Sequence, residues 1–231
     1  MNSNIELKEY SVRWAGKRIL RRKTKHQKST AKRVFLTFDD GPDKKFTPKI
    51  LDQLKRFNVK ATFFVVGKRV QQYPDIAKRI VNEGHDIGNH TFTHPVSPIL
   101  KYSLMEKEIK AAEYMIHKIT GRIPKLFRPT WLSWDFHARK MNQVPRELGY
   151  YSLRWSISSM DWLGMKKVIK HKIFNAKIDS REVLLFHDGS EKSFFPSRKA
   201  TVDVLPDILE IFRCKSIKPL KLSAFIPNIV R

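Results

Sequence analysis

Short apolar segments alternate with helical segments from residue 34 onward, and this alternation constrains the fold more than any other feature. Apolar runs predict strands at 34–38, 61–66, 86–88, 125–128, 150–156, 183–187 and 219–222. Apolar residues at helical spacing predict helices between them, at 46–57, 75–83, 103–119, 135–148, 165–174 and 202–213. Ser103 is expected to cap the third helix and Gly121 to end it. Strands that alternate with helices indicate a parallel α/β fold.

Polar side chains follow the ends of several predicted strands. They are Asp39, Asp40, His90, Arg128, Asp161 and His187. In a parallel barrel the C-terminal ends of the strands share one face, and that face carries the chemistry. We therefore expect a distorted (β/α)7-type barrel of parallel strands, with an active site at the C-terminal strand ends.

The composition is that of one folded domain. The chain has 231 residues, of which 41% are hydrophobic, so it can bury a substantial core. No stretch approaches the roughly 20 consecutive apolar residues that cross a bilayer. The single Cys214 excludes a framework of disulfides within the chain. We expect a folded domain over residues 34–231, preceded by a basic arm over residues 1–33.

The charge is strongly positive. The formal net charge is +24, and residues 1–33 hold eleven Lys and Arg against two Glu. Such an arm suits an anionic polymer or membrane surface, and it equally suits a solvated tail; both interpretations stay open. We expect no specific binding of nucleic acid. The arm lacks the apolar region of a secretory signal, so a cytoplasmic location is expected if the sequence is complete.

Two adjacent carboxylates, Asp39 and Asp40, end the first predicted strand. They repel each other, and a bound cation would relieve that repulsion. His90 and His94, four residues apart, are expected to meet on one face of a helical turn. Two imidazoles and one carboxylate leave a coordination position open for water, as in hydrolytic metal centres. The spacing leaves open which Asp binds the metal and which acts as a general base.

His187 stands at the end of an apolar strand and is a candidate general acid. Asp161 is its candidate partner, because a neighbouring carboxylate raises the pKa of a histidine. Trp162 and Leu185 are expected to wall a small apolar pocket. Arg128 follows another strand and is placed to hold the free carboxylate ionised.

Five segments resemble the motifs of polysaccharide deacetylases of carbohydrate esterase family 4, which share the NodB homology domain. In the order of the family's motifs they are Thr37–Pro42, His90–His94, Arg128–Leu132, Ser158–Trp162 and Leu185–His187. The resemblance covers residues 33–223. Three positions depart from the common pattern, because Thr130, Leu132 and Ser158 stand where many members have Pro, Gly and Asp.

The resemblance implies a role for each matching residue. Asp40, His90 and His94 would bind one divalent metal, zinc by first expectation, with cobalt, nickel or manganese as alternatives. The implied roles of the other residues are general base for Asp39, general acid for His187, orientation of the base for Arg128, tuning of the acid for Asp161, and a backbone oxyanion donor for Trp131. Trp162 and Leu185 would pack against the acetyl methyl group.

The implied activity is the removal of N-acetyl groups from glycans that contain N-acetylglucosamine, with release of acetate. Peptidoglycan, chitooligosaccharide and related wall polymers are the implied substrates. Two alternatives stay open: an O-acetyl esterase acting on an acetylated polysaccharide, and a polyanion-binding protein on an inactive deacetylase scaffold. The resemblance also implies a cell-envelope or secreted location.

Overall fold

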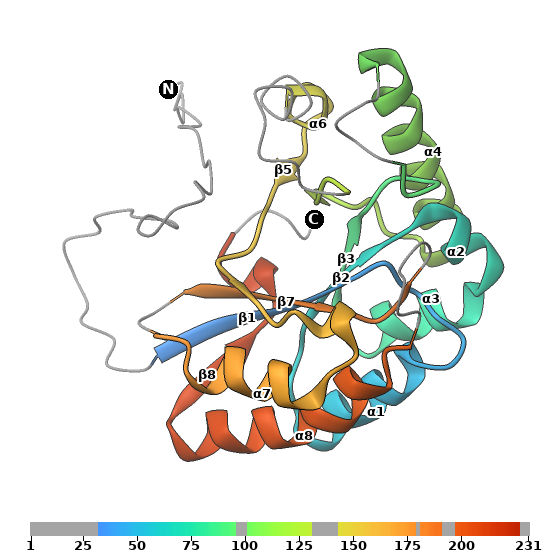
Figure 1. Ribbon diagram of the computed structural model, residues 1–231. Coiled ribbons are helices and arrows are strands. Elements are labelled where there is room, and N and C mark those ends of the chain that lie inside the picture. Colours follow the sequence, from blue (N-terminus) through green and yellow to red (C-terminus); the bar gives the residue numbers. More distant parts are fainter. Residues whose placement is uncertain (1–31, 96–100, 131–142, 179–180, 191–196, 227–231) are drawn as a thin grey trace, which may run out of the picture.

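The computed structural model describes residues 32–95, 101–130, 143–178, 181–190 and 197–226. Its strands form one eight-stranded sheet in the order β5-β4-β3-β2-β1-β7-β6, with β8 also paired to β1 (Figure 1). Every pairing is parallel. The strands are β1 (Lys32–Asp39), β2 (Thr62–Val65), β3 (Asp86–Asn89), β4 (Leu126–Phe127), β5 (Tyr151–Ser152), β6 (Ile157–Ser158), β7 (Glu182–His187) and β8 (Ile217–Leu220).

The prediction of a distorted parallel barrel is confirmed. The sheet curls, and within the described residues no pairing joins its end strands β5 and β6. In Figure 1, α1, α7 and α8 lie together along one side of the sheet, and α2, α3 and α4 lie further around it. The helices are α1 (Thr47–Arg56), α2 (Gly67–Gln72), α3 (Pro74–Asn82), α4 (Tyr102–Thr120), α6 (Gln143–Glu147), α7 (Lys166–Phe174) and α8 (Lys199–Cys214). Among the described helices, none combines the length and the hydropathy required for a membrane span.

Strand β1 is the centre of the sheet. One edge pairs with β7 from Val34 to Asp39, while the other pairs first with β8 and then with β2. Alternate residues of a strand point to opposite faces. Phe35, Thr37 and Asp39 therefore share the inner face of the curled sheet, and β1 delivers the carboxylate of Asp39 to the C-terminal end of that face.

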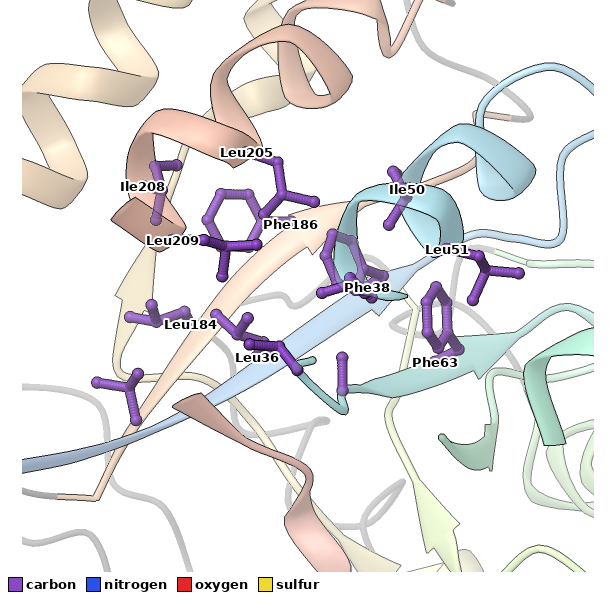
Figure 2. Packing of buried hydrophobic residues seen from close by; sticks show 14 of the residues in the cluster. Leu36, Phe38, Ile50, Leu51, Phe63, Leu184, Phe186, Leu205, Ile208 and Leu209 are labelled. Atoms are coloured by element: carbon purple, nitrogen blue, oxygen red, sulfur yellow. The ribbon is translucent and has the colours of Figure 1, made fainter. Parts of the chain in front are cut away.

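The outer face of β1 and β7 packs against helices. Figure 2 shows Leu36 and Phe38 beside Leu184 and Phe186, with side chains of α1 and α8 over them. The covering residues are Ile50, Leu51, Leu205, Ile208 and Leu209. Each such side chain contributes about 1.5–3 kcal/mol on burial, so this layer fixes the two strands that carry Asp39 and His187.

The inner face holds a smaller apolar cluster. It consists of Phe35, Phe64, Leu126, Leu153, Val183 and Leu222. Arg128 packs against this cluster and is fully buried, with its guanidinium carbon 4.1 Å from the centroid of the Phe64 ring. A buried guanidinium requires polar partners, so the interior becomes polar toward the C-terminal strand ends.

Several predicted boundaries were wrong. Helix α4 begins at Tyr102, and the residue before it, Lys101, makes no side-chain capping bond, so Ser103 is not its cap. Gly121 does end this helix, in the left-handed conformation with φ 70°. Of the strand predicted at 150–156, only Tyr151–Ser152 is a strand, β5; the next strand, β6, begins at Ile157 and lies at the opposite end of the sheet. The short helix α2 was not predicted.

Two predictions fall partly outside the described residues. The helix predicted at 135–148 is described only from residue 143, where Gln143–Glu147 is helical and includes Pro145. Trp131 and Leu132 lie outside the described residues. The role expected for the Trp131 backbone therefore stays a prediction.

Candidate active site

Asp39 and Asp40 are adjacent in sequence but direct their carboxylates to different partners. Asp39 is the last residue of β1, and its Oδ1 lies 2.7 Å from Nη1 of Arg128. Asp40 has a left-handed backbone with φ 73°, so the chain turns sharply after the strand. Its Oδ1 lies 3.0 Å from Nε2 of His94 and 3.4 Å from Nε2 of His90. The turn thereby separates two carboxylates that would otherwise repel each other.

The donor set suits a divalent metal. One ligand atom from each of Asp40, His90 and His94 lies within 4.8 Å of the others. Nδ1 of His90 lies 2.7 Å from the carbonyl oxygen of Arg128. A carbonyl only accepts, so Nδ1 carries the proton and Nε2 keeps its lone pair for a ligand. Two imidazoles and one carboxylate form the kind of set that binds zinc with an open position.

The helical turn predicted for His90 and His94 was wrong. The segment is a loop in which Thr91 and His94 have positive φ, at 68° and 54°. The two rings nevertheless meet, with centroids 5.1 Å apart. The geometry expected from a helical spacing is therefore produced by a different backbone.

Arg128 holds Asp39 through a network of hydrogen bonds that was predicted only in part. Its Nη1 donates to Asp39 and also to Oγ1 of Thr37, at 2.8 Å. Its Nε donates to the carbonyl of Leu153, at 3.1 Å. Thr37 was not predicted to take part, although it lies two residues before Asp39 and hence on the same face of β1. With several acceptors, the guanidinium is fixed in orientation.

His187, which is partly buried, pairs with the fully buried Asp161. Nδ1 of His187 lies 2.7 Å from Oδ1 of Asp161, and Oδ2 also accepts from Oγ1 of Thr201, at 2.8 Å. Burial alone would lower the pKa of His187, but the charge and hydrogen bond of Asp161 outweigh it and raise the pKa to about 9. Burial would raise the pKa of Asp161, and its contacts with His187 lower it instead. The pair therefore favours an imidazolium beside a carboxylate.

The structure brings the other predicted residues to the same end of the sheet. The ring of Trp162 lies nearly perpendicular to that of His187, with centroids 5.9 Å apart. Leu185 lies two residues before His187 on β7 and is 2% exposed. Thr130, which replaces the common Pro, donates its hydroxyl to the carbonyl of Pro95 at 2.5 Å. This substitution therefore ties the loop after β4 to the end of the loop that carries His94.

Arg69 of α2 also supports the site and was not predicted. Its Nη1 contacts Oδ2 of Asp43 at 3.3 Å and its Nη2 donates to the carbonyl of Ser190 at 2.8 Å. One guanidinium thus joins the loop after β1 to the loop after β7. No local sequence signal marks this residue, because these two partners lie 26 and 121 residues away.

Fold and site together define a class of protein, and comparison with known families identifies the class. The family model described as polysaccharide deacetylase matches residues 26–153, more than half of the chain. The chain therefore belongs to the polysaccharide deacetylase family, and the resemblance seen in the sequence motifs is confirmed.

Relatives of known name support this assignment. Two Bacillus cereus proteins, each named peptidoglycan-N-acetylglucosamine deacetylase, are similar to the chain. One is 41% identical over 57% of this chain and 47% of its own length, so the chain spans about half of that relative. The other is 35% identical over 76% of this chain and 79% of its own length.

A solved structure shows the same fold. The crystal structure of the Bc1960 peptidoglycan N-acetylglucosamine deacetylase, in complex with an N-hydroxybenzamide compound, superposes with a TM-score of 0.76. It is 33% identical in sequence and covers 86% of this chain and 90% of its own. The curled parallel sheet is thus the architecture of this family.

Proposed function

We propose that this protein is a metal-dependent deacetylase that removes the N-acetyl group from N-acetylglucosamine units of peptidoglycan and releases acetate. One observation carries the proposal. The candidate base Asp39, the ligand set around Asp40 and the candidate acid His187 lie at adjacent strand ends of a single sheet, where Asp39 and His187 are register partners. The names of the similar Bacillus cereus proteins support peptidoglycan as the substrate class.

Asp40, His90 and His94 are the residues that would hold the metal, and zinc suits them best. Bound there, a divalent ion supplies Lewis acidity, which polarises the amide carbonyl and lowers the pKa of water. Cobalt, nickel and manganese are alternatives, since nitrogen and oxygen ligands of this kind accept several divalent ions.

The remaining residues move protons. Asp39 accepts a proton from the attacking water while the water oxygen bonds to the acetyl carbon. Arg128 orients Asp39 through their ion pair. His187, protonated beside Asp161, gives its Nε2 proton to the nitrogen as the carbon–nitrogen bond breaks. The products are acetate and a free amine on the sugar. The backbone N–H of Trp131 is proposed as a donor to the oxyanion.

The apolar residues beside the acid suit an acetyl methyl group. Trp162 lies against His187, and Leu185 is buried on the same strand. The same pocket would accept an acetate ester, so an O-acetylated polysaccharide is the alternative substrate. An ester needs less help from a general acid than an amide, because an alkoxide leaves more readily than an amine anion. The well-formed pair of Asp161 and His187 therefore favours the amide.

The net charge of +24 supports a second property, attraction to an anionic wall polymer or membrane surface. We propose that the basic arm over residues 1–33 strengthens this attraction. Removal of the arm should lower retention on an anionic polymer, and that retention should fall steeply with salt. Retention without any acetate release would instead favour the polyanion-binding alternative.

Acetate release decides the reaction. The test uses purified peptidoglycan, N-acetylated chitooligosaccharides and O-acetylated xylan, each with zinc-loaded protein, chelated protein, and chelated protein given zinc again. We expect release from peptidoglycan, loss of release on chelation, and recovery with zinc. Release that is insensitive to chelation and to His90→Ala would overturn the metal-dependent mechanism, and release from xylan alone would establish the esterase alternative.

A further inference from the structure

The loop that carries His90 and His94 has a costly backbone. Thr91 and His94 both have positive φ. A β-branched residue such as Thr91 rarely adopts this conformation. Residues held in such regions cost on the order of 1–3 kcal/mol each and persist only where the surroundings enforce them. The loop therefore depends on contacts with other elements.

One side chain outside the five motifs accepts several hydrogen bonds from this loop. Oε2 of Glu108, on α4, accepts from the backbone N–H of Phe92 at 2.9 Å and from that of Thr93 at 2.7 Å. Its Oε1 accepts from the hydroxyl of Thr93 at 2.8 Å. A single carboxylate thus binds the middle of the loop, between its two histidines.

Other contacts hold the loop through α2 and Asn89. At the start of α2, the N–H of Gly67 donates to the carbonyl of Thr91 and the N–H of Lys68 donates to that of Phe92, each at 2.9 Å. Oδ1 of Asn89 accepts from the N–H of Thr91, also at 2.9 Å. The carbonyls of the loop are therefore bound by α2, and the donors in its middle are bound by Glu108 of α4.

We propose that Glu108 is a positioning residue for the metal site, which holds His90 and His94 at the separation that a divalent ion requires before the ion arrives. It acts through the loop and touches neither substrate nor the reacting atoms. The inference rests on the metal-binding part of the proposed function. Groups that orient metal ligands typically change metal affinity or activity 10–100-fold when they are removed, as a rough guide.

The variants Glu108→Gln and Glu108→Ala separate geometry from charge. A glutamine carbonyl still accepts both N–H groups, and its amide can donate to the hydroxyl of Thr93. Glu108→Ala removes all three bonds. Glu106→Ala is the matched control, because Glu106 lies on the same helix and pairs with Lys110 at 2.6 Å, away from the loop.

The measurement is the dissociation constant for zinc, obtained without substrate by competition with a chelating dye. We expect Glu108→Ala to weaken zinc binding by about 10–100-fold, while Glu108→Gln and Glu106→Ala bind like the parent protein. Urea unfolding of the metal-free proteins shows whether each variant folds. If Glu108→Ala does not fold, Thr93→Val, which removes one of the three bonds, should still weaken zinc binding.

Three outcomes overturn the proposal. The first is parental zinc affinity in folded Glu108→Ala and in Thr93→Val. The second is a loss in Glu108→Gln equal to that in Glu108→Ala, which would assign the effect to charge. The third is a parent protein that binds no divalent ion, which would overturn the proposed function as well. A parent that binds zinc but releases no acetate would overturn only the proposed reaction.

Discussion

Asp161 accepts two hydrogen bonds from His187, one from ring Nδ1 and one from the backbone N–H, each 2.7 Å long. The bond to Nδ1 assigns a proton to that nitrogen, because an ionised carboxylate only accepts. The bond to the backbone fixes the strand end from which the ring projects. A single carboxylate thereby fixes the strand end and the tautomer of His187 and is the main cause of its raised pKa.

The first prediction concerns the pKa of His187. In the metal-free protein it is expected at about 9. Because this value lies above the ordinary 6.5, the histidine stabilises the fold fully below about pH 6.5, and this stabilisation is lost as the pH rises through 9. An NMR titration of the ring resonances measures the value directly. A midpoint at or below that of an exposed histidine would contradict the account of the pair.

Asp161→Asn provides the kinetic counterpart. It removes the charge that raises the pKa of His187 and leaves the burial that lowers it. The acid should then lose its proton at lower pH, so the alkaline limb of kcat/KM should move down by about 1–3 units. A limb that stays in place would show that another group gives the proton.

The second prediction separates the two adjacent carboxylates. Asp39→Asn keeps an oxygen acceptor for Arg128 but cannot take a proton from water, so kcat should fall by about 10²–10⁴-fold while zinc stays bound. Asp40→Asn should lose zinc. Metal analysis of both purified variants checks this division. Equal metal loss from both would show that the turn at Asp40 does not separate their roles.

The third prediction concerns the buried guanidinium. Arg128→Met leaves Asp39 buried without its cation and should lower the free energy of unfolding by about 3–5 kcal/mol. Arg128→Lys keeps the charge but cannot reach Thr37, Asp39 and Leu153 together, so its loss should be smaller. Urea denaturation of the metal-free proteins measures both. Equal stability of the two variants would mean that charge at this position matters little.

The sequence allowed the site to be predicted wherever a residue stands at a strand end. Asp39, His90, Arg128 and His187 lie where the predicted strands end, and parallel strands bring such ends together. Strand alternation alone would also have indicated Thr37, since it shares a face with Asp39. These inferences need only the two-residue period of a strand.

The supports of the site follow no local rule. Glu108 reaches the loop from 15 or 16 residues away, and Thr201 reaches Asp161 across 40. In the sequence, Glu108 and Thr201 look like ordinary polar residues of a surface helix, and only the fold brings them to their partners. The segment at His90 was predicted as a helical turn because two histidines four residues apart in sequence meet on one face of a helix. The same sequence separation also allows them to meet in a loop. Its positive φ angles depend on tertiary contacts, and no residue type in the loop predicts them.

The last prediction uses the tight packing of Gly41 against the carboxylate of Asp188. A Cβ added at Gly41 would lie 2.0 Å from Oδ2 of Asp188, which is fully buried and accepts from Thr47 at 2.6 Å. Neither side can yield cheaply, so Gly41→Ala should shift the loop that carries Asp40. The expected result is a weaker zinc complex, measured by dye competition without substrate.

A second substitution should reverse that effect. Burial raises the pKa of Asp188 to about 7, so its charged form is poorly stabilised near neutral pH and its removal should be tolerated. Asp188→Ala clears the carboxylate from the path of the new methyl group. The double variant should therefore bind zinc more tightly than Gly41→Ala alone, with a coupling energy of about 0.5–3 kcal/mol in the mutant cycle. Additive losses would mean that the glycine acts through backbone freedom, because only a steric conflict is relieved by removing its partner.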